Sequence, residues 1–326
     1  MKALPEPLKA RRAMRDTLLA AILTAMEDGD VFFVTADFGS PVLDLIRERY
    51  PQRFINVGIA EQNLINVSAG LALEGFKVFA YAIAPFITMR CFEQIRVNLA
   101  LLSSVRPMNV SLIGVGAGYS YVVSGPTHQC YEDLTLMRSL PNMQVFSPAD
   151  QITAELLARA CLTRPGIKYL RLDAQVVRPL YEPELHNLND GFKVHGNSHE
   201  LCLVATGFMT HTALKAAAHL AKLGLNLSVI DLFDLTHFDT NALLEHLRTA
   251  RRIVSLEEGF QGCGGLDSLL FNLLSRHAVT APFLNIGVAP HYRFELGDRQ
   301  TLHEQVGIGL HTVIEKIQRF CPALPS

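Results

Sequence analysis

Four short segments of the sequence place carboxylate, imidazole, guanidinium or aromatic side chains beside glycine or proline. Glu61 and His128 are of the types that most often transfer protons in enzymes. Phe86 offers an aromatic surface, and Arg90 follows it by one helical turn. We therefore treat these segments as candidates for a site of acid–base chemistry. They are DFGS at 37–40, GIAEQN at 58–63, APF at 84–86 with Arg90, and SGPTHQ at 124–129.

Each of these residues also has a purely structural explanation when it is taken alone. A carboxylate at the start of a helix, as expected for Glu61, gains about 0.3–1 kcal/mol from the helix dipole without any further role. Asp37 could serve only in a turn or as a helix cap, Phe86 could be a core residue, and His128 could be a surface residue. No single residue decides between structure and function.

The elements around these segments alternate between strands and helices. Continuous apolar runs of strand length end at glycine or turn residues, which is typical of strands that are buried on both faces. Such alternation predicts a parallel, doubly wound α/β sheet, in which ligands gather at the carboxyl ends of the strands. The predicted strands lie at 31–37, 54–58, 77–83, 109–116, 143–148 and 167–172, and the predicted helices at 12–28, from 61, from about 86, and at 149–162.

A second α/β unit is predicted after a change of composition. Residues 173–200 are polar and contain two prolines, which favours a linker and an edge hairpin. The expected division is a domain of residues 1–188 and a domain of residues 189–326. The second unit has predicted strands at 201–207, 225–232 and 252–258, predicted helices near 210–223 and 240–250, and a glycine turn that opens a helix after 259.

Composition narrows the class of protein. The 326 residues include 29 basic and 31 acidic side chains, a formal charge of −2, so binding to nucleic acid is not expected. The sequence has no signal-peptide pattern at its start and no apolar run of membrane-spanning length. Its six cysteines are scattered without zinc spacing, which predicts free thiols in a reducing cytoplasm.

Taken together and in order, several motifs resemble the transketolase family. INVGIAEQNLINVSAGLALEG at 55–75, SGPTHQ at 124–129 and LPNMQVFSPAD at 140–150 are similar to its pyrimidine-binding domain. LVATG at 203–207 and IVSLEEGFQGCGG at 253–265 are similar to its C-terminal domain. The resemblance runs from about residue 12 to residue 318. It implies two doubly wound α/β domains and dependence on thiamine diphosphate.

The resemblance also implies roles in holding the cofactor. Glu61 stands at the position of the glutamate that hydrogen-bonds N1′ of the aminopyrimidine, so that N4′ can accept the proton of the thiazolium C2. Phe86 is the expected aromatic wall of the pyrimidine, with Ile87 as the alternative because counting back from Glu93 shifts the register by one residue. Asp37 and Arg90 are expected near the cofactor.

Substrate binding is assigned by the same resemblance. His128 matches a histidine that contacts the reacting hydroxyl or carbonyl group, and Arg171 matches an arginine that binds substrate phosphate. Ser124 and Ser40 are further candidates. Two positions depart from the family: Ser124 replaces an acidic residue that reads a sugar hydroxyl, and Gly116 replaces a phosphate-binding histidine. These departures predict an unusual donor sugar.

The diphosphate-binding part of the family pattern, Gly-Asp-Gly followed by Asn, is not recognisable in the sequence. The resemblance therefore predicts a separate partner subunit that holds most of the diphosphate and its Mg²⁺ (or Ca²⁺), in an α2β2 assembly. The expected reaction is transfer of a two-carbon ketol unit from a ketose to an aldehyde. The alternatives are the β subunit of a 2-oxoacid dehydrogenase-like decarboxylase and a non-catalytic assembly subunit. A 1-deoxyxylulose-5-phosphate synthase fits less well, because Phe233 stands where that enzyme has an arginine.

Overall fold

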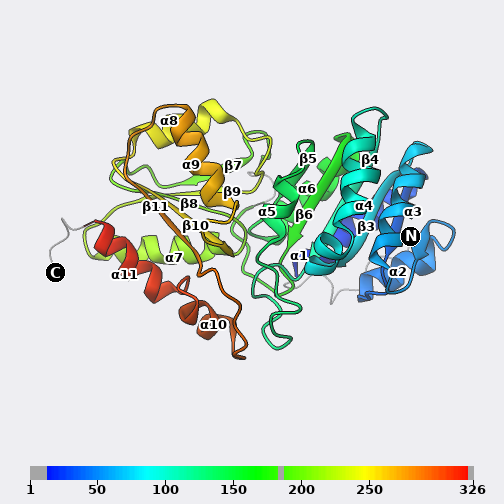
Figure 1. The fold of residues 1–326 in the computed structure, drawn as a ribbon, viewed down its shortest axis with the longest axis horizontal. Coiled ribbons are helices and arrows are strands. Elements are labelled where there is room, and N and C mark those ends of the chain that lie inside the picture. The colour runs from blue at the N-terminus through cyan, green and yellow to red at the C-terminus, as the bar shows by residue number, and fades with distance from the viewer. Residues whose placement is uncertain (1–12, 183–186, 322–326) are drawn as a thin grey trace.

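The computed structural model describes residues 13–182 and 187–321. Two α/β units lie side by side along the long axis of the molecule (Figure 1). Each unit is built on its own sheet. The mainly parallel, doubly wound architecture predicted from the sequence is confirmed, and all six cysteines are free thiols.

The first sheet contains six strands within the described residues, in the order β2-β1-β3-β4-β6-β5, and all of its pairings are parallel. The central strands β3 and β4 are almost entirely buried, because helices cover both of their faces. Their carboxyl ends share one edge of the sheet. The strands are β1 (Val31–Thr35), β2 (Phe54–Asn56), β3 (Lys77–Ile83), β4 (Asn109–Val115), β5 (Met143–Phe146) and β6 (Gly166–Leu172).

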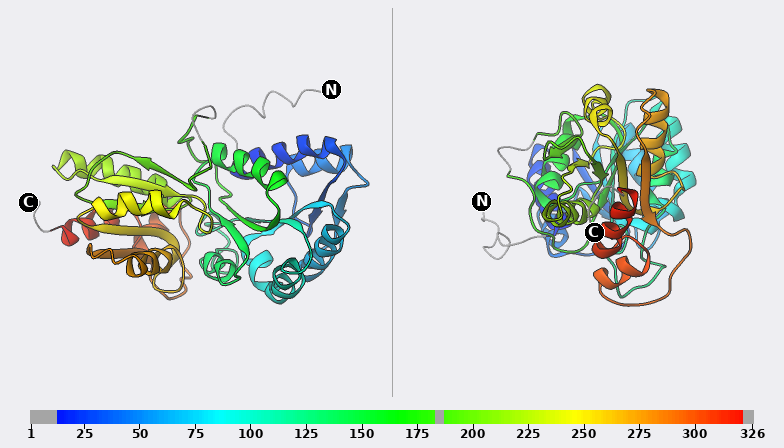
Figure 2. Two further views of the ribbon diagram at one scale, coloured as in Figure 1. Left: turned by 90° about the horizontal axis from the view of Figure 1, so that it is seen from above. Right: turned by 90° about the vertical axis from the view of Figure 1, so that its left-hand side faces the viewer.

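Helices pack on both faces of this sheet (Figure 2). One face is covered by α1 (Met14–Ala25), α2 (Pro41–Arg49) and α6 (Gln151–Thr163). The other face is covered by α3 (Glu61–Leu73), α5 (Asp133–Arg138) and a helical stretch with two π-helical segments. That stretch consists of η3 (Phe86–Arg90), α4 (Phe92–Gln94) and η4 (Ile95–Leu101).

The second sheet has the order β11-β10-β8-β9-β7, and β7 is its antiparallel edge strand. The predicted edge strand is therefore confirmed, but the predicted hairpin is wrong, because β7 pairs with β9 and not with the strand that follows it. The strands are β7 (Phe192–His195), β8 (Cys202–Ala205), β9 (Ser228–Leu232), β10 (Ile253–Phe260) and β11 (Phe283–Val288). The helices are α7 (Met209–Lys222), α8 (Thr240–Thr249), α9 (Leu266–Arg276), α10 (Arg299–Gln305) and α11 (Leu310–Phe320).

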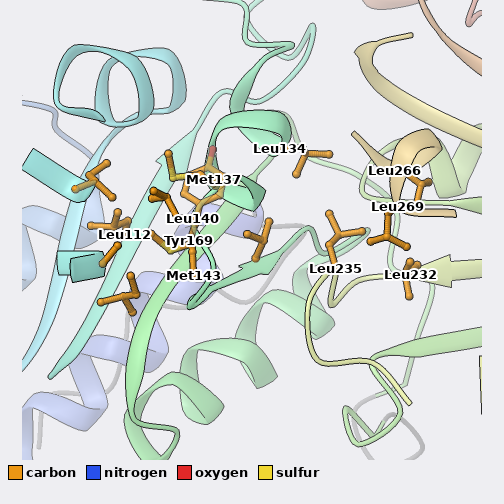
Figure 3. Packing of buried hydrophobic residues seen from close by; sticks show 14 of the residues in the cluster. Leu112, Leu134, Met137, Leu140, Met143, Tyr169, Leu232, Leu235, Leu266 and Leu269 are labelled. Atoms are coloured by element: carbon orange, nitrogen blue, oxygen red, sulfur yellow. The ribbon is translucent and has the colours of Figure 1, made fainter. Parts of the chain in front are cut away.

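One of the buried apolar clusters extends across both units. Leu134 of the first unit belongs to the same buried cluster as Leu235, Leu266 and Leu269 of the second (Figure 3). A backbone bond from Leu235 N to Val145 O, 2.8 Å long, ties the second unit to β5. The units are thus packed against each other. The predicted boundary between residues 188 and 189 falls in the segment between the sheets, and we propose it as the division.

Candidate functional site

Glu61 is the first residue of α3 and lies at the carboxyl-end edge of the first sheet, just after β2. Its side chain is only 6% exposed. The carboxylate accepts a hydrogen bond from Nη1 of Arg90 at 2.9 Å. The helix N-terminus and the guanidinium together give this buried carboxylate a favourable electrostatic environment.

Arg90 ends the π-helical segment η3, and its side chain is 47% exposed. Its guanidinium carbon lies 3.6 Å from the centroid of the Phe86 ring. The segment is also tied to α3 by a hydrogen bond from Nε2 of Gln62 to the carbonyl of Arg90, at 3.3 Å. Glu61, Arg90 and Phe86 therefore form one continuous cluster in which the arginine bridges the carboxylate and the ring.

Phe86 and Ile87, the two candidates for the aromatic wall, point in different directions. The Phe86 ring is half-buried and meets the ring of His128 edge to face, with 5.2 Å between centroids. Ile87 is fully buried in the apolar core. The side chain of Ile87, the alternative candidate from the sequence, packs into the core beneath the cluster, so Phe86 is the candidate that we propose for the aromatic wall.

His128 lies in the loop that follows β4. The ends of this loop are joined by a two-residue bridge, in which Gly118 N donates to Cys130 O at 2.8 Å and Cys130 N to Gly118 O at 3.1 Å. Near His128 the chain turns at Gly125, whose φ of 70° favours glycine, and His128 N donates to Gly125 O at 3.1 Å. Its Nδ1 lies 3.0 Å from Oγ1 of Thr127. The turn directs the imidazole onto Phe86.

Asp37 joins the ends of β1 and β2 through Asn56. Asn56 Nδ2 donates to Asp37 Oδ1, and Asn56 Oδ1 accepts from the backbone nitrogens of Asp37 and Gly58, each at 3.0 Å. The Asp37 backbone has a left-handed φ of 55°. The sequence motifs did not single out Asn56, although a polar residue at the end of a strand, two residues before a glycine, is a signal for such a bridge. The bridge orders the segment that leads into Glu61.

The three other predicted substrate residues lie in different surroundings. Ser40 caps α2, with its Oγ accepting from Leu43 N at 3.3 Å. Ser124 is exposed in the His128 loop. Arg171 is only 3% exposed and pairs with Asp133 at 2.8 Å. The prediction that Arg171 binds substrate phosphate is not supported by this placement, because its guanidinium is committed to the boundary between the units.

Gly116, where the sequence departs from the family pattern, lies beneath the ring of Tyr121. A Cβ at this position would be 1.8 Å from Tyr121 Cε2, and the φ of Gly116 is 92°. The absence of a side chain at residue 116 therefore lets the Tyr121 ring lie against the backbone at the end of β4.

Cys91 underlies the cluster, and its Sγ donates to the carbonyl of Ile87 at 2.9 Å. Burial, and secondarily the charge of Glu61, raises the pKa of this thiol to about 12. Cys91 is therefore a neutral thiol near neutral pH. No group of three or more His, Cys, Asp or Glu side chains that could hold a metal ion occurs in the described part of the chain. Nor does that part contain a helix long and apolar enough to cross a membrane.

Comparisons with known proteins agree with this architecture. Residues 9–179 match the model of the transketolase pyrimidine-binding domain, and residues 191–313 match that of the transketolase C-terminal domain. The chain is 28% identical over 310 residues to a protein of Actinobacillus succinogenes that is named as a subunit of apulose-4-phosphate transketolase, covering 93% of this chain and 96% of the relative. A protein of the same name from Phocaeicola vulgatus is 30% identical over 287 residues, covering 86% and 88%.

Two solved structures have a similar fold. One, described as a split-gene transketolase in an inactive β4 tetramer, has a TM-score of 0.81 and 31% identity, over 94% of this chain and 97% of its own. The other, the transketolase of Campylobacter jejuni, has a TM-score of 0.78 at 20% identity. This chain covers 46% of the latter, and that likeness concerns the fold alone.

Proposed function

The chain belongs to the transketolase family, and we propose that it is the pyrimidine-activating subunit of a split, thiamine-diphosphate-dependent transketolase. In this proposal the enzyme transfers a two-carbon ketol unit from a ketose to an aldehyde, and Glu61 is its activating carboxylate. The observation that carries the proposal is the cluster of Glu61, Arg90, Phe86 and His128. Three segments far apart in the sequence contribute to it.

The residues of this cluster fit the aminopyrimidine of the cofactor. A ring nitrogen needs a hydrogen-bond partner in a dry place, and Glu61 offers a buried carboxylate. The ring needs an aromatic surface, and Phe86 offers one that faces His128 instead of the core. The bound cofactor would supply a nucleophilic carbon for carbonyl chemistry. Glu61 would hold the proton at the pyrimidine nitrogen, while Phe86 would fix the plane of the ring.

We propose that His128 binds the reacting oxygen of the substrate and exchanges a proton with it. An imidazole can do both near neutral pH, and the turn at Gly125 directs it onto Phe86. Arg90 would turn away from the Phe86 face when the pyrimidine binds, since its guanidinium lies on that ring here. Asp37, which joins the ends of β1 and β2, would support the cofactor site from the edge of the sheet.

A partner chain is part of the proposal. Two relatives are named as single subunits of a transketolase, and a similar β-only tetramer is described as inactive. Beside Glu61, Ile59 is 77% exposed, as expected of a face that another chain covers. We propose a cytoplasmic α2β2 assembly in which the partner holds the diphosphate and its Mg²⁺. The described residues of this chain offer no cluster for that metal.

The donor is proposed to be an unusual sugar. The neutral Ser124 and the filled space at Gly116 differ from the family pattern for ketose phosphates. The names of two relatives refer to apulose 4-phosphate. A donor of related shape therefore belongs in any panel of substrates.

The test reconstitutes this chain with its candidate partner, thiamine diphosphate and Mg²⁺, and assays ketol transfer from phosphorylated and free donors. Glu61→Gln should lower turnover by about 100-fold or more, since it cannot hold the proton. Wild-type turnover in that variant would refute the role of Glu61. Activity of this chain alone would refute the need for a partner. Acyl transfer to a lipoyl carrier in place of ketol transfer would identify a 2-oxoacid dehydrogenase-like enzyme, and activity independent of this chain would identify an assembly subunit.

A further inference from the structure

The loop that carries His128 is held at its base by a side chain of the other unit. Glu258, on β10, is almost fully buried, and its Oε1 accepts a hydrogen bond from Tyr119 N at 3.0 Å. Tyr119 is the first residue beyond Gly118, where the loop closes on Cys130. The carboxylate thus crosses the boundary between the units and reaches the beginning of the loop.

Gly118 makes this approach possible. A Cβ on Gly118 would lie 2.0 Å from Oε2 of Glu258, and the φ of the residue is 55°. The chain therefore has a glycine at the one place where the carboxylate passes over the loop backbone. A side chain at residue 118 would push Glu258 away from Tyr119.

Glu258 is itself fixed by two side chains from its own unit. Nη2 of Arg299 donates to Oε2 at 2.8 Å, and Nε2 of His303 lies 2.6 Å from Oε1. The Arg299 guanidinium also pairs with Asp173 of the first unit and lies 3.4 Å from the centroid of the Phe208 ring. Burial alone would raise the pKa of Glu258, but Arg299 and then His303 hold it below its ordinary value. Glu258 is therefore a charged acceptor near neutral pH.

The end of the loop at Cys130 is also attached to Glu258, through Arg171. Nη2 of Arg171 donates to the carbonyl of Glu258 at 2.8 Å, and the carbonyl of Cys130 lies 3.5 Å from that same nitrogen. Nε of Arg171 pairs with Asp133, which opens α5 directly after the loop. Both ends of the His128 loop therefore converge on Glu258.

We propose that Glu258 is a positioning residue, which fixes the His128 loop across the domain boundary and so sets the place of the imidazole against Phe86. The C-terminal domain then contributes to the site without touching substrate or cofactor. The inference rests on the proposed function for the chemistry of His128, but the attachment of the loop is independent of that function. Displacing a positioned group by about 1 Å can cost about 100-fold in rate.

The experiment uses Glu258→Gln in the full chain. Arg299 donates to both oxygens of this carboxylate and Tyr119 N donates to Oε1, so a glutamine, with one oxygen and no charge, must place its NH₂ against a donor and weaken the attachment. We expect hydrogen exchange of the Tyr119 amide to accelerate about 10-fold, because a bond to a neutral amide oxygen is weaker than a bond to a carboxylate and opens more readily. The matched control is Glu257→Gln, the adjacent residue, whose carboxylate binds the start of α9 through Leu266 N and Asp267 N. It should leave exchange in the loop unchanged.

A kinetic cycle with His128→Ala completes the test in the reconstituted enzyme. Glu258→Gln should lower kcat about 10- to 100-fold in the wild-type background and less than about 3-fold when His128 is absent, since contacts acting through one group are not additive. Equal losses in both backgrounds, or wild-type exchange in the loop, would overturn the positioning role. If His128→Ala alone has no effect, the proposed function of His128 fails while the exchange result still judges the attachment. Should Glu258→Gln not fold, Glu258→Asp keeps the charge and withdraws it from Tyr119, with the same expected results.

Discussion

Arg90 neutralises the carboxylate of Glu61 through a 2.9 Å bond while its guanidinium covers the Phe86 ring. One flexible side chain thus occupies both surfaces that the proposed cofactor needs. The bond has a buried acceptor and a half-exposed donor. The bond holds the cluster together, but Arg90 can leave it at moderate cost in free energy, because the half-exposed guanidinium becomes hydrated when the bond breaks.

The first prediction concerns this ion pair. Arg90→Met leaves the buried Glu61 carboxylate without its partner and should lower the free energy of unfolding by about 1–2 kcal/mol, measured by urea titration. Arg90→Met with Glu61→Gln should cost less than the sum of the two single changes. Arg96→Met, which removes an exposed pair with Glu93 on the same helical stretch, should change stability by less than about 0.5 kcal/mol. A larger loss for Arg96→Met than for Arg90→Met would contradict this account.

The second prediction separates the two neighbours at the aromatic wall. Phe86→Ala should weaken binding of thiamine diphosphate to the reconstituted enzyme by about 10-fold, from loss of ring stacking worth about 0.5–1.5 kcal/mol. Ile87→Val should leave that affinity unchanged but lower the free energy of unfolding by about 0.5–1.5 kcal/mol, because Ile87 lies in the core. Calorimetric titration of the cofactor and urea unfolding give the two measurements. If instead Ile87→Val weakened cofactor binding and Phe86→Ala lowered only the stability, Ile87 would be the residue that lies against the cofactor.

The third prediction concerns Gly116 and has a matched glycine elsewhere. Gly29 and Gly116 have φ values of 90° and 92°, but only Gly116 has a side chain, Tyr121, where a Cβ would go. Gly29→Ala should cost about 1–2 kcal/mol from the left-handed backbone alone. Gly116→Ala should cost more, and adding Tyr121→Ala should reduce the extra cost, as followed by thermal unfolding. Equal costs for the two single glycine variants would show that the Tyr121 ring moves aside freely.

Much of the fold could be read from the sequence because its signals are local. Strands such as β3 and β4 are continuous apolar runs, and Glu61, Phe86 and His128 lie in motifs of fixed spacing. The contacts that Arg171 and Ser40 make could not be read in this way. Arg171 is paired with Asp133 and with the carbonyl of Glu258, 38 and 87 residues away in the sequence. A strand-end arginine looks the same whether it meets a ligand or a second domain, so only the packing of the two units distinguishes these outcomes.

The last prediction concerns pH. Burial raises the pKa of Asp231 to about 7, although Tyr181 and Thr210 donate hydrogen bonds to it at 2.6 and 2.8 Å. Burial, and next the charge of Asp267, raises the pKa of Glu257 to about 7 as well. In both cases the folded state binds a proton more tightly than the unfolded state. Each group therefore stabilises the fold most below its unfolded pKa, and stability is lost as pH rises from about 4 to about 7.

Urea unfolding between pH 5 and pH 8 measures this loss. Each carboxyl can lower the free energy of unfolding by at most about 1.4 kcal/mol per pH unit. Asp231→Asn should remove about half of the decrease of the unfolding free energy with pH that the two groups cause. The double variant, Asp231→Asn with Glu257→Gln, should remove the rest, because neither amide titrates. Asp239→Asn is the control, since Asp239 caps α8 by accepting from Ala242 N in an exposed position and an asparagine can make the same cap. It should leave the slope unaltered, and a wild-type slope in the Asp231→Asn variant would show that Asp231 is already charged at pH 5.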